Sequence, residues 1–211
     1  MPVEAYAATR PQEGRSANED AFLVDTVGTP LIALCDGAGN AERAAKKVLR
    51  LFRKLFEEAT PEELVRFPTW ASWVRVLDSS LLGGSQSTFV AGAAVGDRVV
   101  GACTGDSRAY LIDRDGNARI LAENGNGSTG KFRLGSGRAQ AAPIHFQLQP
   151  RDVLLLLSDG AWTPLSLELL RRAVVGASLK HFSEVPQAVL DAASRTGRAD
   201  DMTAVALRVR S

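Results

Sequence analysis

Two aspartates follow short, apolar runs of the sequence, and a glycine follows each of them. The stretch 31–40 (LIALCDGAGN) contains Asp36, and the stretch 153–160 (VLLLLSDG) repeats the construction with Asp159. Short apolar runs bounded by turn residues favour buried strands, so both carboxylates are expected at the mouth of the core. Burying an unpaired carboxylate is costly, and a cation, a metal ion or strong hydrogen-bond donors are therefore expected beside each one.

Further acidic residues occupy comparable positions at expected strand ends or in turns: Glu19, Asp20, Asp106, Asp200 and Asp201. If these strand ends meet at one edge of a pair of sheets, the side chains form an oxygen-rich pocket. Hard cations such as Mg²⁺ and Mn²⁺ prefer such oxygen ligands. Zinc is disfavoured, because the two cysteines lack partners at metal-ligand spacing and both histidines are isolated.

The sequence offers no strong alternative to metal-activated water as the reactive group. No Gly-x-Ser-x-Gly nucleophile elbow is present. Two divalent ions about 4 Å apart activate a water and hold a phosphoryl group between them. An arginine is the usual partner of such a phosphate, and Arg15, close before Glu19 and Asp20, is well placed in the sequence for that role.

The glycine-rich stretch 124–140 (NGNGSTGKFRLGSGRAQ) has some features of a phosphate-binding loop. It matches neither the P-loop pattern nor a dinucleotide-binding pattern after a strand. A mobile surface loop is therefore the favoured interpretation of this stretch.

The elements expected along the chain come in clusters. Strands are expected at 3–9, 21–28 and 31–35, followed by helices at 41–58 and from Thr60 onward, with a break near Pro68. A run of strands then covers residues 87–123 and 144–160, two helices follow at 165–176 and 183–197, and the last strand is expected within 198–209. Clustered strands and clustered helices indicate an α+β layered fold rather than repeated βαβ units.

The expected helix 41–58 has an apolar face and a strongly basic one. Val48, Phe52 and Phe56 fall on the apolar side. The basic residues are Lys46, Lys47, Arg50, Arg53 and Lys54. We interpret this basic face as a solvated surface in preference to a binding surface.

Composition and length are those of an ordinary globular protein, and a single domain covering residues 1–211 is expected. The chain has 45% hydrophobic and 23% charged residues and a net charge of +1. It therefore lacks the basic excess of a nucleic-acid or membrane-surface binder. Cys35 and Cys103 lie in apolar runs and are expected to be buried and reduced. No signal peptide or long apolar run stands out, so a cytoplasmic protein is expected. We also expect the protein to be a monomer.

Six motifs in sequence order resemble those of the metal-dependent serine/threonine protein phosphatases of type 2C. The motifs are RSANEDA, LCDGAGN, STFVAGAAV, TGDSRAYLI, LLLLSDGAW and GRADDMTAVAL. Each motif is weak alone, but six in the expected order make chance agreement remote. The resemblance implies a four-layer αββα sandwich, in which helices flank two central antiparallel sheets.

The resemblance also assigns roles at a site for two Mn²⁺ or Mg²⁺ ions. It makes Asp36 the bridge between both ions and gives Gly37 a carbonyl ligand. The other implied metal ligands are Asp159 and Asp200, with Glu19 and Asp20 acting directly or through water, and Asp106 at a third, weaker ion. Arg15 would hold the phosphate of a phosphoserine or phosphothreonine, which the bridging water would attack without a phosphoenzyme.

The sequence departs from the family pattern at three places. Asp201 stands where most members have Asn, and spacing from Gly197 favours Asp200 as the ligand. Such an Asp-Asp ending resembles the bacterial sporulation and stress-response branch, whose substrates are phosphorylated anti-sigma antagonists. Asn40 replaces a glycine of the turn and Ala38 leaves no histidine there. The short stretch 121–142 implies a reduced substrate-covering flap.

Three functions remain open from the sequence. The first is hydrolysis of phosphoserine or phosphothreonine on a protein partner of a serine/threonine kinase pathway. The second is a weak or inactive family member that acts by binding a partner. The third is a hydrolase of small phosphate esters, which an uncovered site would permit.

Overall fold

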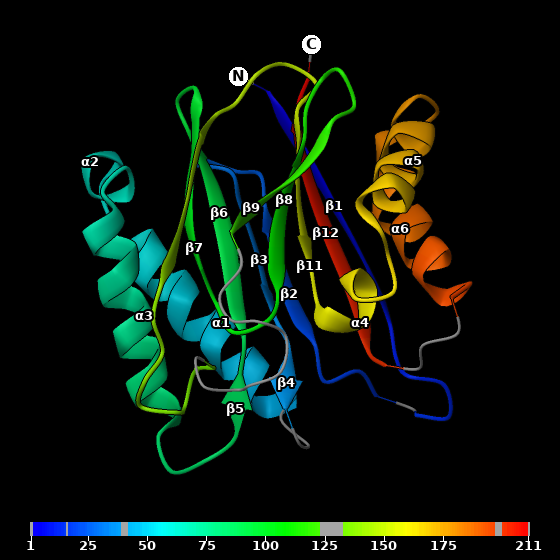
Figure 1. Cartoon of the computed structure of the whole chain (residues 1–211). Helices are drawn as coiled ribbons and strands as arrows, with labels where there is room; N and C mark the ends of the chain where they lie inside the picture. Colours follow the sequence, from blue (N-terminus) through cyan, green and yellow to red (C-terminus); the bar gives the residue numbers. More distant parts are fainter. Residues whose placement is uncertain (1, 16, 39–41, 123–132, 197–199, 211) are drawn as a thin grey trace.

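Two five-stranded antiparallel sheets form the centre of the molecule, in a computed structural model that describes residues 2–15, 17–38, 42–122, 133–196 and 200–210 (Figure 1). The first sheet has the order β1-β12-β11-β8-β9 and is formed by Val3–Arg10, Met202–Val209, Val153–Leu157, Arg108–Ile112 and Ala118–Ala122. The second has the order β10-β7-β6-β3-β2 and is formed by Ala142–Gln147, Arg98–Thr104, Phe89–Val95, Leu31–Cys35 and Ala21–Asp25. A short pair, β4 (Gly37–Ala38) with β5 (Gln86–Ser87), continues beyond β3.

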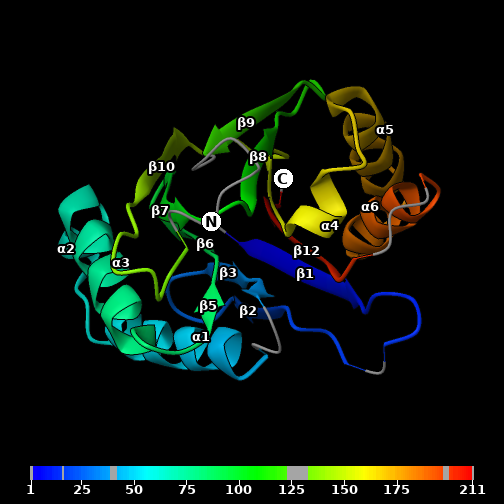
Figure 2. The ribbon, with the colours of Figure 1, turned by 60° about the horizontal axis from the view of Figure 1, so that its bottom comes forward.

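Helices cover the outer face of each sheet, which gives four layers (Figures 1 and 2). Helices α1 (Glu42–Glu57) and α3 (Phe67–Leu81), with the short α2 (Pro61–Leu64), lie on the second sheet. Helices α5 (Leu167–Ser178) and α6 (Val185–Ser194), with the short α4 (Asp159–Trp162), lie on the first. The expected α+β, αββα sandwich is confirmed.

The alternation of side chains along a strand divides the core into three layers. On β3, Ile32 and Leu34 point between the sheets, whereas Leu31 and Cys35 pack beneath α1 and α3. β11 follows the same rule: Leu154 and Leu156 lie between the sheets, and their neighbours pack beneath α5 and α6. A strand buried on both faces needs no polar side, which is why these runs are entirely apolar.

Local signals set the helix boundaries as expected. Thr60 caps α2 with a capping box, since its side chain accepts from the Glu63 amide and Glu63 accepts from the Thr60 amide. The expected break near Pro68 lies at residues 65–66, and α3 begins directly before this proline. Trp70 and Trp73 are buried against Phe52, as core contacts rather than as a ligand cage.

Two further expectations concern the cysteines and membrane-spanning segments. Both cysteines are buried and neither forms a disulfide, as expected. No helix among the described residues has the length and apolar character needed to cross a membrane.

The ends of several strands meet at one end of the sandwich. In the second sheet, Ala21 pairs with Cys35, so Asp20 and Asp36 extend from adjacent positions. In the first sheet, Leu157 pairs with both Arg108 and Ala204, which brings together the segments that carry Asp159, Asp106 and Asp200. Antiparallel pairing therefore gathers acids that are far apart in the sequence.

Candidate metal and phosphate site

The main chain of Asp36 is held in place by the segment between β5 and β6. The amide of Asp36 donates to Thr88 Oγ1 (2.9 Å), and its carbonyl accepts from the Thr88 amide (2.8 Å) and from Ser87 Oγ (3.1 Å). Thr88 Oγ1 also shares a hydrogen bond of 2.7 Å with Ser107 Oγ, at the turn that carries Asp106. These buried hydroxyls fix the position from which the Asp36 carboxylate extends.

Asp36 and Asp20 form an electrostatically strained pair of buried carboxylates. Burial, followed by the nearby charges of Asp20 and Asp159, raises the pKa of Asp36 well above its usual value. Burial is also the main cause that raises the pKa of Asp20 to about 7, with smaller contributions from Asp201 and Asp159. Such crowding of like charges favours the binding of a proton or of another cation.

Asp20 differs from three other buried acids of the described chain. Asp78, Asp152 and Asp201 are satisfied by backbone amides: for example, Asp201 accepts from the amides of Gln12 and Glu19, both at 2.7 Å. Asp20 differs, since neither of its carboxylate oxygens has a hydrogen-bond partner within bonding geometry. The hydroxyls of Thr203 and Ser158 are near enough only to offset part of the rise in its pKa. Asp20 therefore has the unsatisfied oxygens that a cation binds.

Asp159 and Asp200 are brought together by the close approach of α4 to the start of β12. A Cβ built on Gly160 would lie 2.1 Å from the carbonyl oxygen of Asp201 and 3.0 Å from Cβ of Asp200. Only glycine allows the two backbones this distance. The glycine of the second Asp-Gly pair thus has a packing role that places Asp159 beside the Asp200–Asp201 segment.

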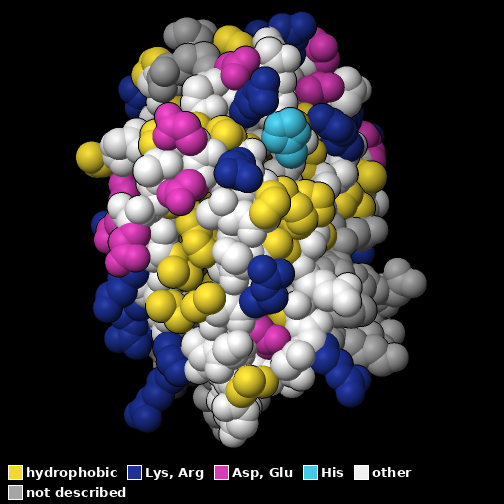
Figure 3. Space-filling view, turned by 90° about the vertical axis from the view of Figure 1, so that its left-hand side faces the viewer, with side chains coloured by type: hydrophobic (Ala, Val, Ile, Leu, Met, Phe, Trp, Pro, Cys, Tyr) yellow, Lys and Arg dark blue, Asp and Glu magenta, His cyan; other side chains and the backbone are white. Residues whose placement is uncertain are grey.

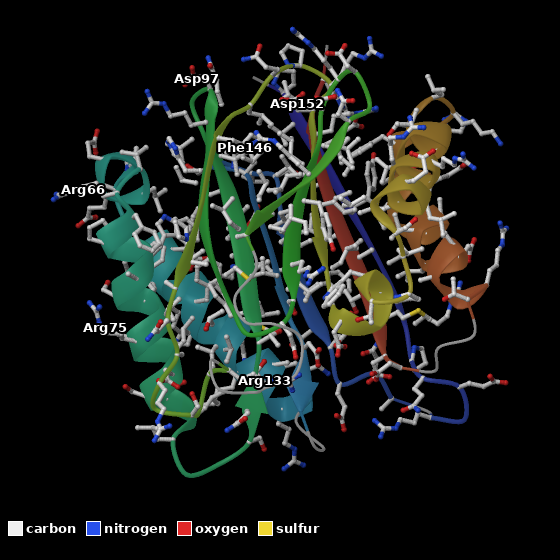
Figure 4. The ribbon with its side chains drawn as sticks, in the orientation of Figure 1. Arg66, Arg75, Asp97, Arg133, Phe146 and Asp152 are labelled. Carbon is white, nitrogen blue, oxygen red and sulfur yellow. The ribbon has the colours of Figure 1, made fainter. Side chains whose placement is uncertain are left out.

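Asp106 is paired with an arginine that sequence reasoning left out of the site. Arg133 Nη2 lies 2.6 Å from Asp106 Oδ2, and the two side chains are only 17% and 20% exposed. Arg133 offsets part of the rise in the pKa of Asp36; burial acts to lower the pKa of Arg133 itself, but the charges of Asp106, Asp36 and Asp159 outweigh burial and raise it. Figure 4 places Arg133 at the end of the sandwich where β4 and α4 lie, opposite the end that carries Asp97 and Asp152. A fixed positive charge is therefore built into the acidic cluster.

The remaining predicted residues lie at the margin of this cluster. Arg15 is half exposed and its guanidinium lies 3.8 Å from the Glu19 carboxylate, in the loop between β1 and β2. The structure gives it no contact with Asp36. Gly37 is buried in β4 and pairs with Ser87. Asn40, which departs from the family pattern, lies outside the described residues.

The donor set fits a hard divalent cation by its chemistry, although the described side chains do not enclose an ion. Within the described ranges, no three Asp, Glu, His or Cys side chains converge closely enough to form a metal site. The fit rests on the unpartnered oxygens of Asp20 and on the raised pKa of Asp36, both of which a cation would relieve.

The expectation of a mobile surface loop is wrong for the described end of the stretch 124–140. Leu134 is fully buried and bridges to Ser87, and Arg133 is mostly buried. Three backbone amides, those of Gly135, Gly137 and Ala139, donate to the Asp78 carboxylate of α3. One signal was present in the sequence: an arginine directly before a lone leucine within a glycine-rich stretch. Residues 123–132 lie outside the described chain.

The close packing at Gly160 yields a stability prediction. We expect Gly160→Ala to lower the free energy of unfolding by about 1–3 kcal/mol or more, because its methyl group overlaps a backbone oxygen that cannot turn away. Chemical denaturation measures the effect. Gly176→Ala in α5 is the matched control: nothing lies within 4 Å of its added Cβ, and alanine should be neutral or stabilising there. Equal stability of both variants would contradict the packing role.

The buried ion pair yields a second prediction, which a double-mutant cycle tests. Arg133→Met should destabilise the protein by about 3–5 kcal/mol, because it leaves the Asp106 carboxylate without its cation. Adding Asp106→Asn should recover part of that loss, since the unpaired charge is then gone. Additive losses in the double variant would show that the two side chains do not interact.

Comparison with known proteins identifies the family and the fold. The chain matches the family described as Stage II sporulation protein E (SpoIIE) over residues 28–210, a range that begins after Arg15, Glu19 and Asp20. A search of curated proteins gave no match.

Solved structures match over almost the whole chain. The Mycobacterium tuberculosis serine/threonine phosphatase PstP/Ppp is 22% identical, with a TM-score of 0.84 and 100% of both chains covered. The S. agalactiae serine/threonine phosphatase is 19% identical, with a TM-score of 0.86, and 99% of this chain and 100% of that chain are covered. A second structure, of the PstP catalytic domain (22% identical, TM-score 0.81, 99% of both chains covered), is a complex with two manganese ions.

At these identities the structures establish a shared fold, whereas the sequence match extends over most of the chain. The chain thus belongs to the SpoIIE family and has the fold of the bacterial metal-dependent serine/threonine phosphatases.

Proposed function

We propose that this protein hydrolyses phosphoserine or phosphothreonine on a protein substrate, with two Mn²⁺ or Mg²⁺ ions as cofactors. The observation that carries the proposal is the buried Asp20–Asp36 pair, with two unpartnered carboxylate oxygens, at the end of a phosphatase fold. Burial of such a pair is costly, and a binding site for cations explains why it is present. The manganese ions in the structure of PstP support the choice of metal.

The residues of the chain would divide the work between holding metal and orienting the phosphate. Asp36, Asp20, Asp159 and Asp200 would hold the ions, with Glu19 and the Gly37 carbonyl at the margin of the set. The ions, when bound, supply Lewis-acid activation of water and neutralise phosphate charge. Arg15 is half exposed and lies beside Glu19 in the loop between β1 and β2, from which its guanidinium would bind a phosphate oxygen on the substrate.

Arg133 and Asp106 call for a different account from the one the family resemblance implies. Asp106 Oδ2 is already paired with a buried guanidinium, whereas Asp106 Oδ1 is buried without a hydrogen-bond partner, so only Oδ1 is open to the weaker third ion that the resemblance implies. Arg133 instead supplies a permanent positive charge to the cluster, which offsets the repulsion among the nearby carboxylates. The same charge favours an approaching phosphate over a neutral group.

The structure supports Asp200 rather than Asp201 as the metal ligand. Both carboxylate oxygens of Asp201 accept backbone amides and hold the loop that carries Glu19. Asp200 is only partly buried and accepts one amide, from Asp201, through Oδ1. The extra acid of the Asp-Asp ending therefore serves as an anchor for the loop that carries Arg15 and Glu19.

The two other functions suggested by the sequence have weaker support. A purely partner-binding role leaves the costly carboxylate cluster without a purpose, since all the acids expected of a metal site are present. Hydrolysis of small phosphate esters uses the same chemistry. It differs from the proposed function only in how the enzyme recognises the rest of its substrate.

Activity is the first test of the proposed function. We expect Mn²⁺-dependent release of phosphate from a phosphothreonine peptide, abolished by EDTA. Asp36→Asn should lower kcat/KM by about a hundred-fold or more, because it removes the carboxylate at the centre of the cluster. The measurement is phosphate release over a range of Mn²⁺ concentrations.

Thermal unfolding of Asp36→Asn in EDTA provides the control for folding. Because burial and neighbouring charges disfavour the ionised carboxylate, the neutral amide should keep or raise the unfolding temperature. Full turnover by Asp36→Asn, or equal turnover by the wild type with and without EDTA, would overturn the metal-dependent mechanism.

The assignment of Asp200 is tested by measuring Mn²⁺ affinity calorimetrically in two variants. Asp200→Asn should weaken Mn²⁺ binding by about ten-fold or more, because a ligand is lost. Asp201→Asn should alter stability more than affinity, by about 1–3 kcal/mol, since an amide nitrogen cannot accept one of the two backbone hydrogen bonds. Unchanged Mn²⁺ affinity in Asp200→Asn would contradict the assignment.

A further inference from the structure

A groove runs between helix α1 and the edge strand β2 and leads to the acidic cluster. It has a volume of about 660 Å³, and its walls come from α1 on one side and from β2 with the residues before it on the other. Figure 2 shows these two elements side by side. Asp20 is among the lining residues, so this α1–β2 groove is continuous with the candidate site.

Four basic residues of α1 line the groove: Arg43, Lys46, Arg50 and Arg53. Their spacing of three or four residues places them on one side of the helix. All four are exposed. A space-filling view likewise shows several Lys and Arg side chains gathered along one lower edge of the molecule (Figure 3).

The charge of the groove is greatest toward the catalytic end. Arg53, at the far end, is paired with Glu57 (2.7 Å) and Asp25 (3.3 Å). Asp25 lies at the end of β2 opposite to Asp20, so the direction of β2 fixes which end of the groove adjoins the site. Nearer the site, Arg43 and Arg50 have no salt bridge to an acid within the described part of the chain.

The floor of the groove is apolar and its strand is an edge strand. Leu23 and Leu49 contribute to the lining, and Phe22 is 41% exposed there. β2 pairs with β3 on one side only within its sheet. Basic walls over an apolar floor, beside an edge strand, suit an extended polypeptide that carries acidic and apolar side chains.

We propose that the α1–β2 groove binds an extended acidic segment of the phosphoprotein substrate, next to its phosphorylated residue. This inference rests on the proposed function for the phosphate itself. From Arg43 to Arg53 the helix rises about 15 Å, which matches about four or five residues of extended chain. The favoured substrate therefore has acidic residues within about four positions of the phosphorylated residue, on one side of it.

A protein segment fits the groove better than a nucleic acid does. The chain as a whole has a net charge of +1, without the basic excess of a nucleic-acid binder. The floor of the groove is apolar, with Leu23, Leu49 and Phe22, and it suits the side chains of a polypeptide better than a continuous phosphate backbone. A peptide can place its acidic residues beside α1 and only its phosphate group at the cation-binding end.

The test compares two phosphothreonine peptides of equal length, one with acidic residues at the four positions on each side and one with Ser and Gln there. Wild-type protein with Mn²⁺ should show about ten-fold higher kcat/KM for the acidic peptide at low salt, since each exposed charge pair contributes a small factor. The ratio should fall toward one at about 0.5 M salt, because exposed charges are screened. The double variant Lys46→Glu/Arg50→Glu should lose the preference at low salt as well.

Lys54→Glu is the matched control, because Lys54 is an exposed residue of the same helix that does not line the groove. It should retain the full preference. Loss of the preference in this control, no preference in the wild type, or equal competition by a single-stranded oligonucleotide would each overturn the inference. Thermal unfolding establishes that the double variant is folded.

A binding measurement separates this inference from the proposed function. Fluorescence anisotropy of a labelled, unphosphorylated acidic peptide measures binding in the groove independently of hydrolysis. Binding that weakens about ten-fold in the double variant supports the groove even if neither peptide is hydrolysed. Hydrolysis of both peptides at equal rates, without binding of the labelled peptide, would support the proposed phosphatase activity and contradict peptide binding in the groove.

Discussion

The crowding of carboxylates at one end of the sandwich is the constraint on which the rest of the site depends. Asp20 and Asp36 are buried at adjacent strand ends; burial is the main cause that raises the pKa of both, Asp20 adds to the rise at Asp36, and Asp159 adds to it at both. Isolated, such a pair would disfavour the folded state, because desolvation and repulsion act in the same direction. Three features of the surrounding structure offset this cost: hydrogen bonds that fix the main chain of Asp36, the guanidinium of Arg133, and loops anchored by hydrogen bonds.

Arg133 connects this cluster to the helix layer on the second sheet. Asp78 of α3 accepts three backbone amides from residues 135–139, and Leu134 bridges to Ser87. The segment that carries Arg133 is therefore held at both its main chain and its side chain. Trp162 of α4 donates to the Asp106 carbonyl, so the partner of Arg133 is held from the first sheet. A single buried ion pair thus joins elements from both halves of the sandwich.

In the proposed function, the same end of the molecule would combine recognition of the phosphate with recognition of the surrounding peptide. The carboxylates and Arg133 form a compact polar centre, and the α1–β2 groove extends from it along the outer edge of the second sheet. Chemistry on a phosphate needs only the centre. Selection among phosphoproteins would need contacts beyond the phosphate, and the groove beside the site would offer them.

The sequence by itself determined the layered fold and pointed to most of the acids that the structure brings to one end of the sandwich. Apolar runs that end in Asp-Gly, helix caps such as Thr60, and the order of the motifs depend on local chemistry, and local chemistry can be read along the chain. The strand boundaries agree within a few residues for the same reason. The basic face of α1 was also visible in the sequence, but its orientation toward a groove was not.

Only the tertiary structure decided which buried carboxylates lack hydrogen-bond partners and which already accept backbone amides. Asp201 and Asp20 look alike in the sequence, yet Asp201 accepts two backbone amides from a loop about 180 residues earlier in the chain, whereas the oxygens of Asp20 have no partner. Arg133 reaches Asp106 across 27 positions, from a stretch whose composition indicates a surface loop. Burial and long-range pairing set the energy of a charged group, and both depend on segments that meet only when the two sheets pack.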